Sequence, residues 1–261
     1  MDDSTVVHAS GLNILIEFGY DGTDFFGSQV QKNAPTVAGA LETALEKLYG
    51  VKLRLAIASR TDRGVHARLT GASVRIPAGG GPRVESLKKA LNASLPVAVR
   101  VYRIRTVEPS FHARHAAISR EYRYRWREVA EPDPLESRYT VHQPRRLDRD
   151  AVSVAVNAIC GVHRFDRFCK AESLPVDSSC RVESAAVRWT GSRGEFRIVA
   201  DRFLHQMVRR LIWTIFEIGC GCLNFDAFQA SVSIGAPLPR VGVVPPKGLT
   251  LWNVRFAKVL R

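Results

Sequence analysis

The order in which strand-like and helix-like segments follow one another most constrains how this chain can fold. Apolar residues alternate along 12–20 and recur with helical spacing along 37–48, between Thr36 as an N-cap and Gly50 as a stop. Further elements are predicted as strands at 53–57 and 72–76, a helix at 84–94 and a strand from residue 97. This order, β-α-β-β-α-β, is that of the ferredoxin-like split unit.

The second half of the chain repeats this order more loosely. Its predicted elements are a strand at 118–127, a helix from its cap Asp148 to Cys160, strands at 182–190 and 195–203, helices at 204–218 and from Asp226, and a strand at 249–257. We therefore expect an α+β fold of two ferredoxin-like (RRM-like) halves, 1–107 and 108–261, with 108–117 as the hinge. Their antiparallel sheets would form a central cleft.

Charge narrows the choice of partner. The 261 residues are 46% hydrophobic, which excludes a largely disordered chain, and Lys plus Arg total 38 against 25 Asp plus Glu, for a net charge of +13. Such a balance favours an anionic partner, with nucleic acid first, and makes the expected cleft basic. The alternative is a solvated surface that is merely basic.

The five cysteines indicate neither a disulfide framework nor a metal site. Their number is odd, and Cys160, His163, Cys169 and Cys180 do not have the spacing of a compact zinc finger. Buried free thiols are the expected state, and no metal is predicted.

Targeting and membrane signals are also missing from the sequence. The first 13 residues contain two acids and no Lys or Arg, and no apolar run approaches the ~18 residues that span a bilayer. We expect a cytoplasmic protein with no membrane partner, organellar only if a transit peptide is missing from this chain.

One carboxylate stands in an unusual setting. In ASRTDRGVHA, residues 58–67, Asp62 lies between Arg60 and Arg63, just after an apolar run. Asp before a glycine-containing turn with a flanking Arg is common in ordinary surface turns. The other interpretation is a reactive carboxylate that its neighbours keep ionised.

The strand at 118–127 combines rings and guanidinium groups. Alternation places Ile118, Arg120, Tyr122, Tyr124 and Trp126 on one face and Ser119, Glu121, Arg123, Arg125 and Arg127 on the other. RNA-binding sheets use rings for stacking and arginines for phosphates. The alternative is an amphipathic strand whose aromatic residues, Trp126 above all, belong to the core.

A polar residue on the apolar helix 204–218 needs a partner. Arg209 stands near the start of this helix, where an unpaired guanidinium would be costly to bury. Asp62 is a candidate for that partner.

Six blocks of the sequence resemble one family in order and spacing. They are EFGYDGTDFFGSQ at 17–29, RTDRGVHA at 60–67, FHARHAAISREYRY at 111–124, GVHRFDRF at 161–168, FLHQMVRR at 203–210 and PPKGLTL at 245–251. The chain resembles the tRNA pseudouridine synthases of the TruA type along almost its whole length.

The resemblance implies roles for individual residues. Asp62 would be the catalytic carboxylate, Tyr122 would lie against the target base and Arg209 would form an ion pair with Asp62. Leu251 would be an apolar wall of the pocket, and Arg60 would help to hold the nucleotide out of its stack.

The resemblance to this family also implies a reaction and its partners. The activity would be isomerisation of uridine to pseudouridine in structured RNA, most readily the anticodon stem-loop of tRNA, by a homodimer that uses no cofactor. Whether the carboxylate attacks as a nucleophile or stabilises a cationic ribose stays open.

Two positions depart from the family pattern and keep other functions open. Arg63 stands where the family has a small residue, and Ser28 stands where tryptophan is usual; residues 240–244 also match poorly. The alternatives are a TruA-like RNA-binding or assembly factor with weak or no catalysis, and a small-molecule enzyme with the same cleft.

Overall fold

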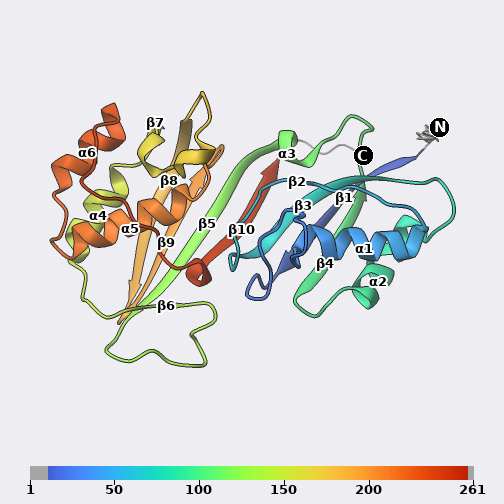
Figure 1. The fold of residues 1–261 in the computed structure, drawn as a ribbon, viewed down its shortest axis with the longest axis horizontal. Coiled ribbons are helices and arrows are strands. Elements are labelled where there is room, and N and C mark those ends of the chain that lie inside the picture. Colours follow the sequence, from blue (N-terminus) through green and yellow to red (C-terminus); the bar gives the residue numbers. More distant parts are fainter. Residues whose placement is uncertain (1–10, 258–261) are drawn as a thin grey trace.

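The computed structural model describes residues 11–257, which form one large sheet with helices packed against it (Figure 1). The strands are β1 (Leu12–Tyr20), β2 (Ala56–Ile57), β3 (His66–Ile76), β4 (Val99–Thr106), β5 (Ala117–Glu128), β6 (Val141–Gln143), β7 (Gly161–Arg164), β8 (Ser179–Thr190), β9 (Arg193–Ala200) and β10 (Leu249–Phe256). The helices are α1 (Val37–Tyr49), α2 (Val84–Ser94), α3 (Ala113–Ala116), α4 (Arg149–Asn157), α5 (Met207–Gly219) and α6 (Phe225–Ile234), with short 3-10 turns η1 (Asp166–Phe168), η2 (Ala171–Ser173) and η3 (Pro246–Gly248). Most of the N-terminal stretch considered above for targeting lies outside the described residues.

The sheet is continuous across both parts of the chain. Its strand order is β4-β1-β3-β10-β5-β9-β8-β7, with β2 paired to β3 and β6 paired to β5. The last strand, β10, joins the two parts: it runs parallel to β3 at Thr250↔His66 and Leu251↔Ala67, and antiparallel to β5. The two expected sheets are therefore parts of a single sheet that meet at β10.

Capping residues explain where helices α1 and α4 begin and where α1 ends. The side chain of Thr36 accepts a hydrogen bond from the N–H of Gly39, and Gly50 ends α1 in the left-handed conformation. Asp148 accepts from the N–H groups of Asp150 and Ala151 at the start of α4, as its sequence position predicted.

Some predicted boundaries differ from the structure. The strand expected at 53–57 pairs only at Ala56–Ile57, because the N–H of Leu55 donates to the Glu42 carboxylate instead of to a neighbouring strand. The helix expected to reach Cys160 ends at Asn157, where the chain turns into the short strand β7.

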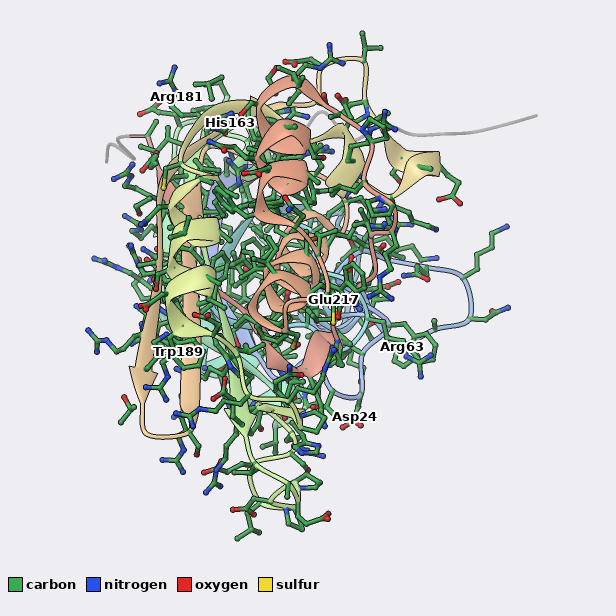
Figure 2. All side chains as sticks on the ribbon, turned by 90° about the vertical axis from the view of Figure 1, so that its left-hand side faces the viewer. Asp24, Arg63, His163, Arg181, Trp189 and Glu217 are labelled. Carbon is green, nitrogen blue, oxygen red and sulfur yellow. The ribbon has the colours of Figure 1, made fainter. Side chains whose placement is uncertain are left out.

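The helices leave one face of the sheet bare. In Figure 2 the sheet is seen nearly edge-on, with the helices to one side and nitrogen-tipped side chains projecting from the other. On the covered side, Tyr124 and Trp126 of β5 pack against Phe216 of α5, which places the core between helix and sheet. None of the described helices is long and apolar enough to cross a membrane.

Candidate active site

A cavity of about 1480 Å³ is lined by residues from both parts of the chain. Its cationic lining residues are Arg60, Arg63, Arg114, Arg120, Lys170, Arg202 and Arg209. Among the described residues that line it, Asp62 is the one carboxylate. A cavity with this charge balance attracts a polyanion and places one acid within it.

The loop at 58–65, which carries Asp62, is fastened by the segment that follows β1. The N–H of Ser28 donates to the carbonyl of Thr61 (3.1 Å), and its buried hydroxyl accepts from the N–H of Thr61 (2.8 Å). Gly27 allows this approach: its φ is 93°, and a Cβ there would lie 2.8 Å from the Thr61 carbonyl oxygen. The serine that replaces the expected tryptophan thus fixes the residue next to Asp62.

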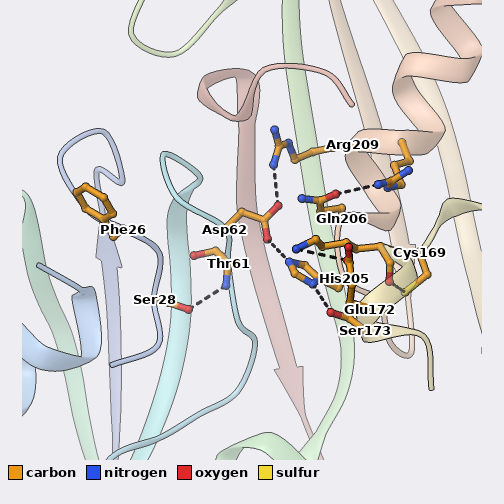
Figure 3. A network of polar contacts seen from close by, with 12 residues as sticks. Phe26, Ser28, Thr61, Asp62, Cys169, Glu172, Ser173, His205, Gln206 and Arg209 are labelled. Carbon is orange, nitrogen blue, oxygen red and sulfur yellow. Dashed lines mark hydrogen bonds and ion pairs between the residues drawn. The ribbon is translucent and has the colours of Figure 1, made fainter. Parts of the chain in front are cut away.

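Asp62 forms an ion pair with Arg209 (Figure 3). Nη1 of Arg209 donates to Oδ2 of Asp62 at 2.8 Å, and Nε of the same arginine donates to the carbonyl of Val244 at 3.0 Å. The Arg209 side chain is only 13% exposed and that of Asp62 22%. Arg209 therefore has fixed partners for its charge, and the pair is largely screened from solvent.

Sequence reasoning did not assign a role to His205, which also contacts Asp62. Its Nε2 lies 3.4 Å from Oδ1 of Asp62, and its Nδ1 shares a 2.8 Å hydrogen bond with the hydroxyl of Ser173 in η2. The helix predicted from residue 204 begins at Met207, so His205 stands in the turn before α5 and not one helical turn from Arg209. The block FLHQMVRR at 203–210, which contains both residues, was the available signal in the sequence.

Tyr122 lies in the cavity wall, 5% exposed, with its ring edge-on to Phe203 at 5.1 Å. Its hydroxyl shares a 3.2 Å hydrogen bond with that of Ser59. Burial raises the pKa of Tyr122 to about 12; the hydrogen bond from Ser59 opposes this shift, and the nearby charge of Asp62 adds to it. The phenol is therefore neutral at physiological pH.

Arg60 is exposed at the cavity wall, close to Arg114. Partial burial, and then the like charge of Arg114, lower the pKa of Arg60. Arg120, on the same face of β5 as Tyr122, is held by the backbone carbonyls of Ala58 and Asp201. Arg60 is thus available to a ligand, whereas Arg120 braces the 58–65 loop.

Leu251 does not reach the cavity surface. It is fully buried in β10, opposite Tyr122 in the strand register. Side chains opposite each other in adjacent strands share a face, so Leu251 packs beside Tyr122. The leucine that lines the cavity is Leu249.

The two faces of β5 have separate surroundings. Tyr124 and Trp126 are buried in the core, so of the three rings only Tyr122 lines the cavity. On the other face, Arg123 and Arg125 bond to Glu195 and lie over the ring of Trp252. Of the arginines of β5, Arg120 therefore lines the cavity together with Tyr122, whereas Arg123 and Arg125 do not.

Arg63, the second departure from the family pattern, also lines the cavity. Its guanidinium carbon lies 4.0 Å from the centre of the Phe26 ring, a cation–π contact. Phe26 lines the cavity as well and is 38% exposed. The added cation therefore extends the basic wall without contacting Asp62 through any hydrogen bond or ion pair found in the described residues.

The cysteines and other metal-binding side chains do not gather in the described part of the chain. No group of three His, Cys, Asp or Glu residues there is placed to hold a metal ion. Cys169 and Cys180 are buried free thiols, whereas Cys160 and Cys222 are exposed.

The site has the features of an enzyme that acts on a nucleic acid: one anchored carboxylate, one neutral phenol and a basic cavity. Comparison with known proteins agrees. A family model described as tRNA pseudouridine synthase matches residues 155–257.

Relatives match over nearly the whole chain. The tRNA pseudouridine synthase A of Geobacillus sp. (strain WCH70) is 35% identical over 244 residues, covering 93% of this chain and 98% of the relative. That of Roseiflexus sp. (strain RS-1) is 36% identical over 248 residues, covering 94% and 90%. That of Halalkalibacterium halodurans is 37% identical over 209 residues, covering 80% and 79%. The chain belongs to the tRNA pseudouridine synthase family, a family of isomerases, as its sequence blocks predicted.

Proposed function

We propose that this protein isomerises uridine to pseudouridine in tRNA, with the anticodon stem-loop as its substrate region. The observation that carries the proposal is the Asp62–Arg209 pair, a fixed carboxylate in a cavity whose other charged lining residues are cations. The names of the relatives support tRNA as the substrate. The cavity volume of about 1480 Å³ suits a nucleotide together with part of its backbone.

The reaction breaks the N1–C1′ bond of uridine and forms a C5–C1′ bond. The base must turn between the two steps; C5 loses its proton and N1 gains one, so the product is an isomer of the substrate. An ionised carboxylate serves this chemistry as the nucleophile or as the counter-charge of a cationic ribose. Asp62 is the residue we assign to it, with Arg209 keeping its charge in place.

The other predicted residues take supporting roles in this proposal. Tyr122 forms the surface on which the base stacks and turns, with Leu251 packed beside it. Arg60, exposed at the cavity wall, takes the place of the extruded nucleotide or binds its phosphate.

The decisive experiment uses an unmodified tRNA transcript and scores pseudouridine by its base-specific chemical reactivity. The wild-type protein should form product, and Asp62→Asn should bind the transcript with similar affinity and form none. Transcripts with single uridines of the anticodon stem-loop replaced by cytidine identify the site. Tight binding by the wild type without product would instead support a non-catalytic RNA-binding factor.

We also propose the finer organisation expected from the sequence. The order β4-β1-β3-β2 before residue 107 and the order β10-β5-β9-β8 after it support two ferredoxin-like halves, 1–107 and 108–261. We propose a homodimer in the cytoplasm, where bacterial relatives of this chain would meet their tRNA. Light scattering of the purified protein tests the dimer: a mass near 29.0 kDa would contradict it.

A further inference from the structure

We propose that His205 is a positioning residue that holds the plane of the Asp62 carboxylate in the orientation required for the reaction. This inference rests on the proposed function and adds to it a residue that the family resemblance did not supply. It starts from the contacts on the two oxygens of Asp62, which Figure 3 shows between Arg209 and His205.

Each carboxylate oxygen of Asp62 has its own partner. Arg209 donates to Oδ2 at 2.8 Å, and Nε2 of His205 lies 3.4 Å from Oδ1. With Arg209 alone, the carboxylate could still rotate about its terminal bond, because one contact fixes one oxygen. The second partner restricts this rotation. A misoriented reacting group costs rate even when substrate binding is intact.

Ser173 contacts the ring nitrogen of His205 that does not face Asp62. Its hydroxyl is 2.8 Å from Nδ1, whereas Nε2 is the nitrogen 3.4 Å from Oδ1 of Asp62. When the hydroxyl donates to Nδ1, the imidazole proton is on Nε2, on the side of the carboxylate. The positioning role requires this tautomer.

The backbone around His205 is fixed as well. Its carbonyl accepts from the N–H of Lys170 at 3.0 Å, which joins it to the start of η2. The next residue, Gln206, has φ 63°, an unfavourable conformation for a non-glycine residue that the surrounding contacts impose. The histidine ring is thus held in place by its chain connections and by Ser173, although 42% of its side chain is exposed.

Two substitutions separate the contact with Asp62 from the contact with Ser173. In His205→Gln the amide nitrogen can take the place of Nε2 and donate to Asp62. In His205→Asn the shorter amide reaches only the position of Nδ1, near Ser173. A positioning role predicts that the Asn variant is slow and that the Gln variant recovers most of the rate.

The measurement is the single-turnover rate at saturating tRNA transcript, together with RNA affinity and melting temperature. We expect His205→Asn to lower the rate about tenfold, as for loss of one polar partner of a charged group, and Ser173→Ala to lower it less. Affinity should be unchanged in both. The matched control is His163→Asn, which alters a histidine of β7 that lies outside the cavity lining and whose ring bonds to the carbonyl of Cys160; its saturating rate should equal that of the wild type.

Each outcome bears on a definite claim. A wild-type rate in His205→Asn, or equal losses in the Asn and Gln variants, would overturn the positioning role while leaving the proposed function intact. A lower melting temperature that accounts for the loss in all His205 variants would also overturn it. Absence of product with wild-type protein would overturn the proposed function and this inference with it.

Discussion

Single residues decide how the carboxylate in this cavity is held. Arg209 projects from a helix whose buried face is apolar, and its Nε and Nη1 both have fixed acceptors. The pairing with Asp62 could be anticipated from sequence because a buried guanidinium requires an anion and the family resemblance implies this partner. The contact from His205 could not, because its ring direction depends on Ser173, which belongs to a different segment.

Arg209→Met should lower the rate of product formation by ~10²–10³, the loss typical of one preorganised electrostatic partner. The methionine keeps much of the arginine stem, so packing of α5 should change little. Arg210→Met is the matched control, since Arg210 bonds to Gln206 rather than to Asp62. Single-turnover rates of the two variants are compared at saturating RNA; equal losses in both would mean that the effect comes from the helix and not from the ion pair.

Tyr122 should not act as an ionised base at neutral pH. Burial raises the pKa of its phenol to about 12, so the group keeps its proton through the physiological range. The pH–rate profile between pH 6 and 10 should therefore have the same shape in the wild type and in Tyr122→Phe, whatever the difference in absolute rate. A limb that is present in the wild type and missing from the Phe variant would show that this phenol ionises during turnover.

At the scale of elements, the strand before the loop at 58–65 was predicted from sequence, whereas its length and the contacts that hold the loop were not. Alternation predicted a strand at 53–57 leading into the loop. Strand pairing is limited to Ala56–Ile57, because the N–H of Leu55 donates to the Glu42 carboxylate and not to a neighbouring strand. The helix caps Thr36 and Asp148 were predictable because each depends on atoms within three residues. The fastening of Thr61 by Ser28 joins residues far apart in the chain, which local patterns do not encode.

Ser28→Ala should destabilise the fold by about 1–3 kcal/mol, the cost of leaving a buried backbone donor without its acceptor. The affected donor is the N–H of Thr61, the residue before Asp62, to which we assign the catalytic role. Urea unfolding monitored by circular dichroism gives the free energy of unfolding. Ser86→Ala, which removes an exposed hydroxyl from α2, serves as the control and should change it little. Equal stability of Ser28→Ala and wild type would show that water or another group replaces the hydroxyl.

At the scale of the whole molecule, a net charge of +13 and a cavity lined by seven cations determine how RNA is bound. The order of elements and the basic cleft were predictable from periodicity and composition. The continuous sheet was not, because its central pairings join β10 to β3 and β5 across long stretches of sequence.

RNA affinity should fall steeply with salt. Each phosphate contact contributes about −0.7 to −0.9 to the slope of log K against log salt concentration, so several contacts should give a slope of about −3 or steeper. Fluorescence anisotropy with labelled tRNA transcript and the Asp62→Asn variant, which forms no product, measures this slope. Replacing Arg60, Arg114 and Arg202 together by Met should make the slope shallower by about 2 to 3. A flat dependence would contradict the RNA-binding assignment itself.

The folded state should also lose stability above about pH 10. Burial raises the pKa values of Tyr20, Tyr122 and Tyr124 above 10.0, the ordinary value of a solvated tyrosine. As pH rises, these phenols lose their protons in the unfolded chain at a lower pH than in the folded protein. Their contribution to the free energy of unfolding is therefore complete below pH 10 and is lost as pH rises toward the pKa values of the folded state. Each should contribute up to about 1.4 kcal/mol per pH unit to the decline.

Urea unfolding at pH 8, 9, 10 and 11 tests this expectation. Tyr124→Phe keeps the buried ring and removes one titrating group, so the decline from pH 10 to 11 should be smaller in this variant. An unchanged slope would mean that lysines or other groups control the alkaline transition.

The place of β10 has a consequence for how the protein is made in a cell. While the chain is still being translated, β1, β3 and β4 can assemble with α1 and α2, but β5 has no neighbour on the side that β10 will occupy. The ribosome must release Leu249–Phe256 before the two parts of the sheet are joined at this strand, so completion of the sheet waits for this segment. A product truncated before β10 therefore carries most of the residues of both cavity walls and lacks the strand through which the two parts of the sheet pair.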